Sequence, residues 1–307
     1  MSKIASSNLQ IPNYKQFTIF KNKLVISLLI VCLWNFAASV FAYAQSSTIA
    51  YTRLTNGYWQ IWTKKLDGDP VQMTTTSYDK RMPVWSPNGK KILYRTNNRE
   101  LFLVDVETKK ETQLLKNFGW MTDPVFFKDD SHILFARFDS NIKDKSDLYT
   151  SDLEGTERTL ITNKTGLQYA PSLSPDQKQI VYVSGHGYGT HEIYLLDLET
   201  KKETQLTKNQ SLEIHPVFSP DGKQIAYASD AASNFDIFVR DLKTHEEKRI
   251  TDWLGTDLSP SWSPDGKQIA FTSDRGGTLQ IWVMDANGEN AHVFVQEKIA
   301  SQEPSWK

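Results

Sequence analysis

The sequence has almost no cysteine and little net charge. One cysteine occurs in 307 residues, which excludes a disulfide framework and a cysteine-based zinc site. The formal net charge of −1 excludes a strongly basic nucleic-acid-binding protein. Aromatic residues make up 12% and charged residues 23% of the chain, a composition that excludes intrinsic disorder. We therefore expect a folded protein that does not bind nucleic acid.

The sequence also lacks the motifs of common catalytic sites. It contains no Gly-x-Ser-x-Gly nucleophile turn, no phosphate-binding Gly-rich loop and no His-Glu-x-x-His zinc motif. The chemistries that need these arrangements are therefore not indicated. We expect a protein that is not an enzyme and that uses no cofactor.

Residues 1–44 have the pattern of a targeting segment. They contain four lysines and no acidic residue, residues 24–41 are almost entirely apolar, and Ala42-Tyr43-Ala44 follows. These features are typical of a secretory signal peptide, here cleaved after Ala44. Because about 18 apolar residues are just enough to span a bilayer, an uncleaved signal anchor is the alternative, and it would be the only link to a membrane. We expect a periplasmic or secreted protein.

The rest of the chain, residues 45–307, differs in charge from the first 44 residues. It holds all 36 acidic residues but only 31 of the 35 basic ones, so its net charge is −5, and it contains no cysteine. It also has no second apolar run long enough to span a membrane. This part is predicted to be one soluble domain.

A repeated element fills this domain. In its clearest copy, residues 260–271 read Pro-Ser-Trp-Ser-Pro-Asp-Gly-Lys-Gln-Ile-Ala-Phe. A period of 40–50 residues predicts a propeller or a helical array. Related copies or fragments begin at prolines spaced 41, 47, 45, 44 and 44 residues apart, namely Pro83, Pro124, Pro171, Pro216, Pro260 and Pro304.

The patterns within each unit favour the propeller. Each unit contains four short segments separated by turn residues, and none has a helical pattern of ten residues. The second segment repeats Ile-x-aromatic, as in Ile225-Ala226-Tyr227, and the third repeats aliphatic-aromatic, as in Ile237-Phe238. Such segments are typical of β-strands. The sequence therefore predicts an all-β fold, a six-bladed β-propeller of four-stranded antiparallel blades.

The two ends of the repeat region are incomplete in complementary ways. The first unit begins near Ile49 and lacks a first strand, whereas residues 303–307 resemble a first strand with nothing after it. Joining the two fragments gives six complete blades and removes the open edges of the array. We expect the C-terminal strand to close the ring by joining the N-terminal blade.

Turn residues punctuate the blades. In the Pro-Asp-Gly turns, glycine supplies the positive φ that closes a tight hairpin. We expect strained or rebuilt turns where Gln177 follows Asp176 and where Ser131 follows Asp130, because glycine is missing there. A second set of aspartates is predicted to accept backbone N–H bonds in turns rather than to act in catalysis, namely Asp105, Asp152, Asp197, Asp241 and Asp285.

The repeated Pro-x-Trp-Ser-Pro-Asp-Gly-Lys-x-Ile-Ala-Phe element resembles the WD-repeat-like repeat of TolB-family propellers, over about residues 48–306. The resemblance implies a periplasmic component of the Tol-Pal cell-envelope system with a Pal-like lipoprotein as partner. TolB proteins carry an α/β domain before the propeller, and we expect no such domain here, so the resemblance does not extend to TolA contacts. Similar repeats occur in prolyl oligopeptidase-type propellers and oligogalacturonate lyases.

The loops differ between the two ends of the blades. Those joining the second to the third segment, and the fourth to the next unit, vary in every unit and emerge on one face, which we call the variable-loop face. Variable loops on a constant scaffold often carry binding sites, and aromatic residues are enriched at interfaces and suit sugar stacking. The candidate partner-binding residues are Tyr58, Trp59, Tyr78, Trp120, Tyr169, Tyr188 and Trp253.

A second candidate site lies at the mouth of the central channel. The residues before the six prolines should line it, and Asp123, His215 and Glu303 among them could hold a cation or a peptide amine. His186, His191 and His215 are the only candidate metal ligands considered, and their spacing matches no known metal motif. We therefore expect no bound metal.

Three functions remain open on these observations. The first is a monomeric binding or scaffolding propeller that engages a cell-envelope protein through the variable-loop face. The second is a carbohydrate-binding or polysaccharide-degrading, lyase-like propeller that uses the same aromatic residues. The third is a purely structural role in the envelope. The sequence does not name the partner, because propeller function resides in loops that share no motif.

Overall fold

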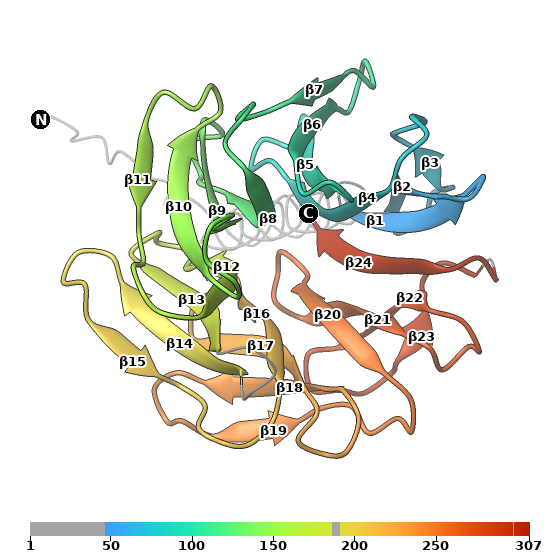
Figure 1. The fold of residues 1–307 in the computed structure, drawn as a ribbon. Helices are drawn as coiled ribbons and strands as arrows, with labels where there is room; N and C mark the ends of the chain where they lie inside the picture. Colours follow the sequence, from blue (N-terminus) through green and yellow to red (C-terminus); the bar gives the residue numbers. More distant parts are fainter. Residues whose placement is uncertain (1–46, 186–190, 297) are drawn as a thin grey trace, which may run out of the picture. The chain divides into compact units, whose positions relative to one another are not determined.

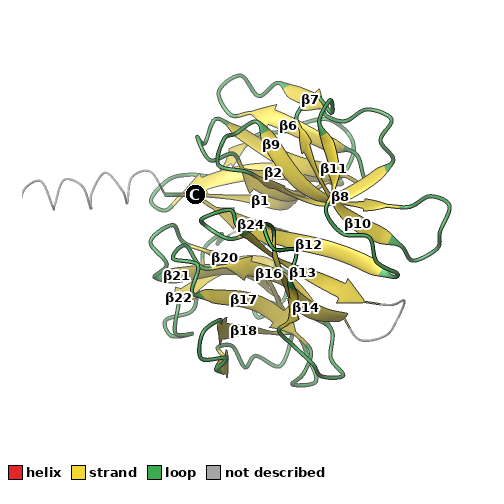
Figure 2. Cartoon of the chain, turned by 90° about the vertical axis from the view of Figure 1, so that its left-hand side faces the viewer, coloured by secondary structure: helices red, strands yellow, loops and turns green. Residues whose placement is uncertain are grey.

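The computed structural model describes residues 47–185, 191–296 and 298–307. Their strands form six antiparallel sheets of four strands, arranged around a central axis as the blades of a propeller (Figure 1). Figure 2 shows the same blades from the side, joined by turns and loops. The predicted six-bladed all-β propeller is confirmed, while the predicted targeting segment, residues 1–44, lies outside the described residues. In the described ranges, no helix is long and apolar enough to cross a membrane.

Each blade begins with a strand beside the axis and continues outward. The innermost strands of blades 1 to 6 are, in order, β24 (Ser301–Trp306), β4 (Lys80–Trp85), β8 (Trp120–Phe126), β12 (Leu167–Leu173), β16 (Glu213–Phe218) and β20 (Asp257–Trp262). The second strands are β1 (Thr48–Thr55), β5 (Lys91–Thr96), β9 (His132–Phe138), β13 (Gln179–Gly185), β17 (Gln224–Ser229) and β21 (Gln268–Ser273).

The outermost strand of each blade is shorter and more polar than the other three. The third strands are β2 (Tyr58–Lys65), β6 (Leu101–Asp105), β10 (Ser146–Asp152), β14 (His191–Asp197), β18 (Asp236–Asp241) and β22 (Gln280–Asp285). The outermost strands have only two or three residues, namely β3 (Val71–Gln72), β7 (Glu111–Gln113), β11 (Arg158–Leu160), β15 (Glu203–Gln205), β19 (Glu247–Arg249) and β23 (His292–Val293). Short, polar edge strands limit pairing with other chains.

The chain ends close the ring as predicted. Strand β24 pairs antiparallel with β1, with Ile49 opposite Trp306. The backbones of Thr48 and Lys307 exchange two hydrogen bonds, of 2.7 and 2.9 Å. The Trp306 indole donates to Ser47 Oγ at 2.5 Å. Blade 1 is therefore built from both ends of the described chain.

Apolar side chains of the second strands fill the space between neighbouring blades. Between blades 6 and 1, Ile49 and Tyr51 pack with Ile281 and Val283 around Trp306. Comparable buried clusters occupy the other interfaces. Burial of apolar surface contributes about 25 cal/mol per Å², so the stability of the ring depends on contacts between blades as well as within them.

The geometry of the hairpin turn between the first two strands explains why most of these turns contain glycine. In blade 5, Asp221 Oδ1 accepts the Ser219 hydroxyl at 2.7 Å and the Lys223 N–H at 3.1 Å, and Gly222 has a φ of 72°. Gln177 takes the same place in blade 4 with a φ of 62°, a left-handed conformation that costs about 1–2 kcal/mol for a residue with a side chain. The predicted strain at Gln177 therefore has a structural basis.

The predicted glycine position in blade 3 was wrong by one residue. Asp130, with a φ of 59°, occupies the glycine position, and Ser131 follows it. Asp129 takes the role of the turn aspartate, because its Oδ1 accepts the Ser131 N–H at 2.9 Å. Aspartate tolerates the left-handed region better than most residues, so this turn keeps the shape of the others.

The aspartates of the outer turns are structural, as predicted. Asp105 and Asp197 accept the N–H groups of Thr108 and Thr200, both at 2.8 Å. These backbone and side-chain hydrogen bonds from Thr108 and Thr200 lower the pKa of both carboxyls. These bonds fix the turns.

Candidate functional site

A β-bulge interrupts every innermost strand at its proline. In β16 the register shifts between Ile214 and Val217, which leaves His215 and Pro216 outside the ladder. Proline cannot donate to the ladder, and the residue before it adopts a positive φ that side-chain-bearing residues rarely take. The six values are Met82 55°, Asp123 50°, Ala170 47°, His215 51°, Ser259 53° and Glu303 59°.

These six residues, which we call the pre-proline ring, line one pocket at the axis. Its volume is about 160 Å³, and the six prolines form much of the remaining wall. The pocket brings together Asp123, His215 and Glu303 from blades 3, 5 and 1. Each residue lies near the middle of its strand, so the ring lies inside the channel, between the two faces of the propeller.

Two carboxylates link successive blades within the ring. Glu303 Oε2 accepts the Met82 N–H of the next blade at 2.9 Å and the Thr52 hydroxyl at 3.2 Å. Asp123 Oδ2 accepts the Ala170 N–H of the next blade at 3.1 Å. Each carboxylate therefore satisfies a backbone donor that the bulge removed from the ladder. The ring contributes to fold stability, and it also concentrates negative charge at the pocket.

His215 lies in the same ring and is held neutral by its surroundings. Its Nδ1 lies 3.3 Å from Ser259 Oγ of the next blade. Burial lowers the pKa of His215, while the carboxylates of Asp123 and Glu303 act in the opposite direction. Because burial dominates, the imidazole offers one donor and one acceptor at neutral pH.

One predicted aromatic residue is connected to the pocket through an arginine. The Arg81 guanidinium lies 4.3 Å from the centre of the Trp59 ring and 4.0 Å from Glu303 Oε1. Tyr58, beside Trp59 on β2, is 39% exposed. Trp59, Arg81 and Glu303 thus form a continuous path from the rim of the variable-loop face to the pre-proline ring.

Two further tryptophans are exposed on loops or strand starts of this face. Trp120 is 58% exposed and stacks near Arg99, with 5.3 Å from guanidinium to ring centre. Trp253 is 39% exposed, and its indole N–H donates to Asp274 at 3.1 Å. Both rings are held by polar partners and remain accessible, which suits a binding surface.

Two of the predicted partner-binding tyrosines are used inside the fold. The Tyr169 hydroxyl lies 2.7 Å from His191 Nδ1, within β12 and β14 of one blade, and burial raises the pKa of Tyr169. Tyr78 packs against Lys80, whose Nζ lies 4.0 Å from the ring centre. Tyr188 lies outside the described residues. Both Tyr78 and Tyr169 are half-buried, and hydrogen bonds or stacking tie their rings to neighbouring strands, while their role in partner binding stays a prediction.

The candidate metal ligands are separated by other contacts. His191 bonds Tyr169, His215 lies against Ser259, and His186 lies outside the described residues. Among the residues that the structure describes, no group of three or more His, Cys, Asp or Glu side chains is placed to hold a metal ion.

Sequence reasoning missed the arginines and the buried charges near the site. The position two residues before each proline carries a charge only at Arg81, which was a usable signal. The position three before each proline is buried throughout and holds three charged residues, Lys80, Glu213 and Asp257. Lys80 Nζ donates to the Thr76 and Tyr78 carbonyls at 2.8 and 2.9 Å. Burial raises the pKa of Glu213 to about 7.

Comparisons with known proteins agree with this architecture. TolB from Acinetobacter baumannii has a TM-score of 0.74 and 23% identity, covering 86% of this chain and 67% of that one. A TolB-type protein from Agrobacterium tumefaciens has a TM-score of 0.70 and 22% identity, covering 84% and 91%. An oligogalacturonate lyase in complex with manganese is more distant, with a TM-score of 0.55 and 16% identity over 82% and 74%.

The likeness to these solved structures concerns the fold alone. The family assignment rests on a sequence match instead: the TolB beta propeller domain matches residues 139–307, more than half of the chain. The matched region begins in blade 3 and runs through the closing strand β24. The chain therefore belongs to the TolB β-propeller domain family.

Proposed function

We propose that this chain is an exported, non-catalytic propeller that binds a protein of the cell envelope through its variable-loop face. The observation that carries the proposal is the pre-proline ring, which places Asp123 and Glu303 in one pocket. Arg81 connects this pocket to Trp59 on β2, so charge and aromatic area are available to the same partner. Interfaces commonly combine such a polar centre with aromatic anchors.

The chemistry of the pocket favours a donor-rich segment of the partner. Two carboxylates attract a lysine or arginine side chain, and the neutral His215 adds one donor and one acceptor. A pocket of about 160 Å³ accepts one side chain rather than a folded element. We infer that a loop of the partner inserts a cationic or amide side chain at the axis.

The tryptophans supply contact area around this centre. The Arg81 stack on Trp59 and the Asp274 bond of Trp253 restrict both rings before binding. Side chains that are already ordered lose less entropy on association. Trp59, Trp120 and Trp253 are therefore the anchors that we assign to the interface.

The resemblance to TolB proteins suggests a Pal-like lipoprotein of the Tol-Pal system as the partner. We propose that this chain binds it as a monomer. The targeting pattern of residues 1–44 supports export to the periplasm, where such a partner lies. A carbohydrate ligand is the second candidate, since the aromatic rim also suits sugar stacking and the fold is shared with an oligogalacturonate lyase.

Titration with purified Pal-like lipoprotein from the same source tests the proposal. We expect saturable binding by calorimetry and a loss of at least about tenfold in affinity for Trp120→Ala and for Trp253→Ala, as for interface anchors. Glu303→Gln should weaken binding, because it removes charge from the pocket and keeps the side-chain shape.

Two controls separate binding from folding and from the alternative. Lys248 is exposed on the outer strand β19, and the Lys248→Ala variant should bind as the unaltered protein does. Oligogalacturonate and other acidic polysaccharides are titrated in parallel and assayed for cleavage. Binding or cleavage of a polysaccharide, with no affinity for the lipoprotein, would replace the proposal with the carbohydrate function.

A further inference from the structure

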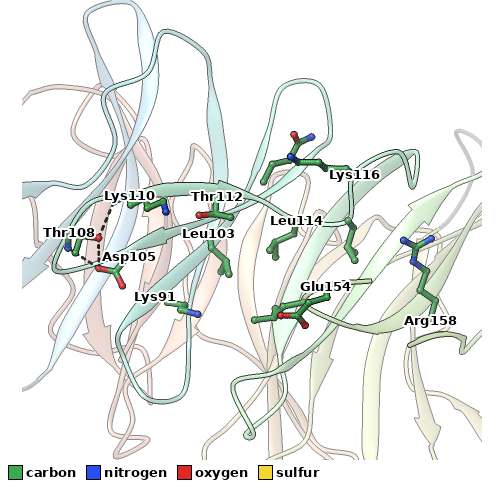
Figure 3. A pocket seen from close by; sticks show the side chains of 13 residues that line it. Lys91, Leu103, Asp105, Thr108, Lys110, Thr112, Leu114, Lys116, Glu154 and Arg158 are labelled. Carbon is green, nitrogen blue, oxygen red and sulfur yellow. Dashed lines mark hydrogen bonds between the residues drawn. The ribbon is translucent and has the colours of Figure 1, made fainter. Parts of the chain in front are cut away.

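A second pocket lies on the side of the ring, between blades 2 and 3 (Figure 3). Its volume is about 590 Å³, and we call it the lateral groove. Strands β5, β6 and β7 of blade 2 form one wall, and the turn after β10 together with Arg158 forms the other. The groove is separate from the pre-proline ring, so an occupant here does not depend on the proposed function.

A local departure from the repeat accompanies the groove. In four blades a threonine follows the outermost strand and its Oγ1 accepts an N–H of the third strand at 2.8–2.9 Å. In blade 2 this place is taken by Leu115, which has a φ of 46°. Leu115 packs with Leu103 and Leu114 in the cluster between blades 2 and 3, and all three line the groove.

The leucines give the groove an apolar floor. Leu153 of blade 3 completes it, and no aromatic side chain lines the pocket. The Gly155 turn approaches so closely that an added Cβ would lie 2.8 Å from Leu115 Cδ2. The floor is therefore shared by both blades, and its chemistry suits aliphatic side chains rather than the stacking faces of a sugar.

Cationic side chains surround this floor. Lys91, Lys110 and Lys116 come from blade 2 and Arg158 from blade 3 (Figure 3). Among the described residues, none of these four cations forms an ion pair. The Arg158 guanidinium instead lies 4.3 Å from the Phe118 ring centre.

The two carboxylates in the lining, Asp105 and Glu154, offset only two of these four positive charges. The lateral groove thus has an excess of positive charge in a domain whose overall charge is negative. An anionic ligand would be attracted to this groove.

The equivalent groove between blades 4 and 5 provides a comparison within the molecule. Gln179 stands there in place of Lys91, and Glu247 in place of Arg158. Thr207 takes the place of Leu115 and accepts the Ile193 N–H at 2.8 Å. Lys243 stands in place of Glu154, so the excess of positive charge falls from two to one, and the apolar floor differs only at the Leu115 position.

We propose that the lateral groove binds an extended peptide segment in which acidic and aliphatic residues alternate. Aliphatic side chains would pack against Leu153, the most exposed leucine of the floor, and carboxylates would reach Lys110, Lys116 and Arg158. Strand β7 offers an edge of only three residues, so side-chain contacts rather than backbone pairing would hold such a segment. The partner is thus a protein with an acidic, unstructured stretch.

Fluorescence anisotropy with a labelled seven-residue peptide of alternating Glu and Leu tests the proposal on the full chain. We expect saturable binding that weakens between about 50 mM and about 300 mM salt, because the pairing is electrostatic. A peptide of alternating Lys and Leu should not bind. The double variant Lys110→Glu/Lys116→Glu should lose at least about fivefold in affinity.

Lys202→Glu/Lys208→Glu is the matched control, because it reverses the equivalent charges between blades 4 and 5. This variant should bind within about twofold of the unaltered protein, and both variants should keep the unaltered melting temperature. Equal losses of affinity in the two double variants would overturn the proposal. Binding of the basic peptide as tight as that of the acidic peptide would also overturn it. So would groove-dependent binding of phosphatidylglycerol vesicles or oligogalacturonate without binding of the acidic peptide.

Discussion

The closing strand β24 should contribute as much stability as an innermost strand within the chain. Trp306 of β24 is 9% exposed, and Trp262, at the same position of β20, is 7% exposed. Each ring fills a cluster between blades. Truncating a buried tryptophan to alanine costs about 3–5 kcal/mol. At about 2–4 °C per kcal/mol for a domain of this size, we expect Trp306→Ala to lower the melting temperature by about 6–20 °C.

The comparison between the two variants makes this prediction sharp. Differential scanning calorimetry should show similar losses of stability for Trp306→Ala and Trp262→Ala. Trp120→Ala, at an exposed site, should lose less than about 1 kcal/mol of stability. If Trp306→Ala behaved like Trp120→Ala, the last strand would not be part of the cooperative unit, and the closure argument would fail. Deleting residues 302–307 should lower the melting temperature at least as much as Trp306→Ala.

Two further predictions concern backbone strain and a buried acid. Gln177 has a φ of 62°, and Gln177→Gly removes the steric cost of this left-handed conformation. After the entropy cost of glycine, the free energy of unfolding measured in urea should rise by about 0.5 kcal/mol; a lower free energy of unfolding would contradict the strain. Burial raises the pKa of Glu213 from 4.5 to about 7, so the unfolded chain releases this proton first and stability falls as pH rises from about 4.5 to 7. Relative to Glu213→Gln, which mimics the neutral acid, the unaltered protein should lose up to about 3 kcal/mol over that range; parallel profiles would refute the assignment.

The sequence predicted the architecture because the repeat encodes it locally. Proline, the Pro-Asp-Gly turn and the Ile-x-aromatic strand each fix one feature of a blade, and six copies specify the ring. The glycine position of the blade 3 turn was predicted one residue too late. Asp129 takes the aspartate position and Asp130 the glycine position, and the sequence alone does not show which of two neighbouring aspartates is the turn aspartate.

The candidate site was less accessible from sequence, because contacts between blades decide exposure. Tyr169 looked like a loop aromatic, yet its hydroxyl bonds His191 across two strands. The role of Glu303 as an acceptor for Met82 depends on a residue more than two hundred positions away. A departure from the repeat was the one usable sequence signal for the lateral groove: Leu115 stands where most blades have threonine.

The pairing of β24 with β1 also sets an order in time. Thr52 donates to the Gln302 carbonyl across 250 positions of sequence, so the first strand of the propeller waits for almost the last residues to be synthesised. Blades 2 to 6 can form in succession as the chain emerges, but blade 1 must be the last to form. Until then β1 exposes one unpaired edge, which is a template for aggregation. A chain that stops a few residues early therefore leaves this edge permanently open.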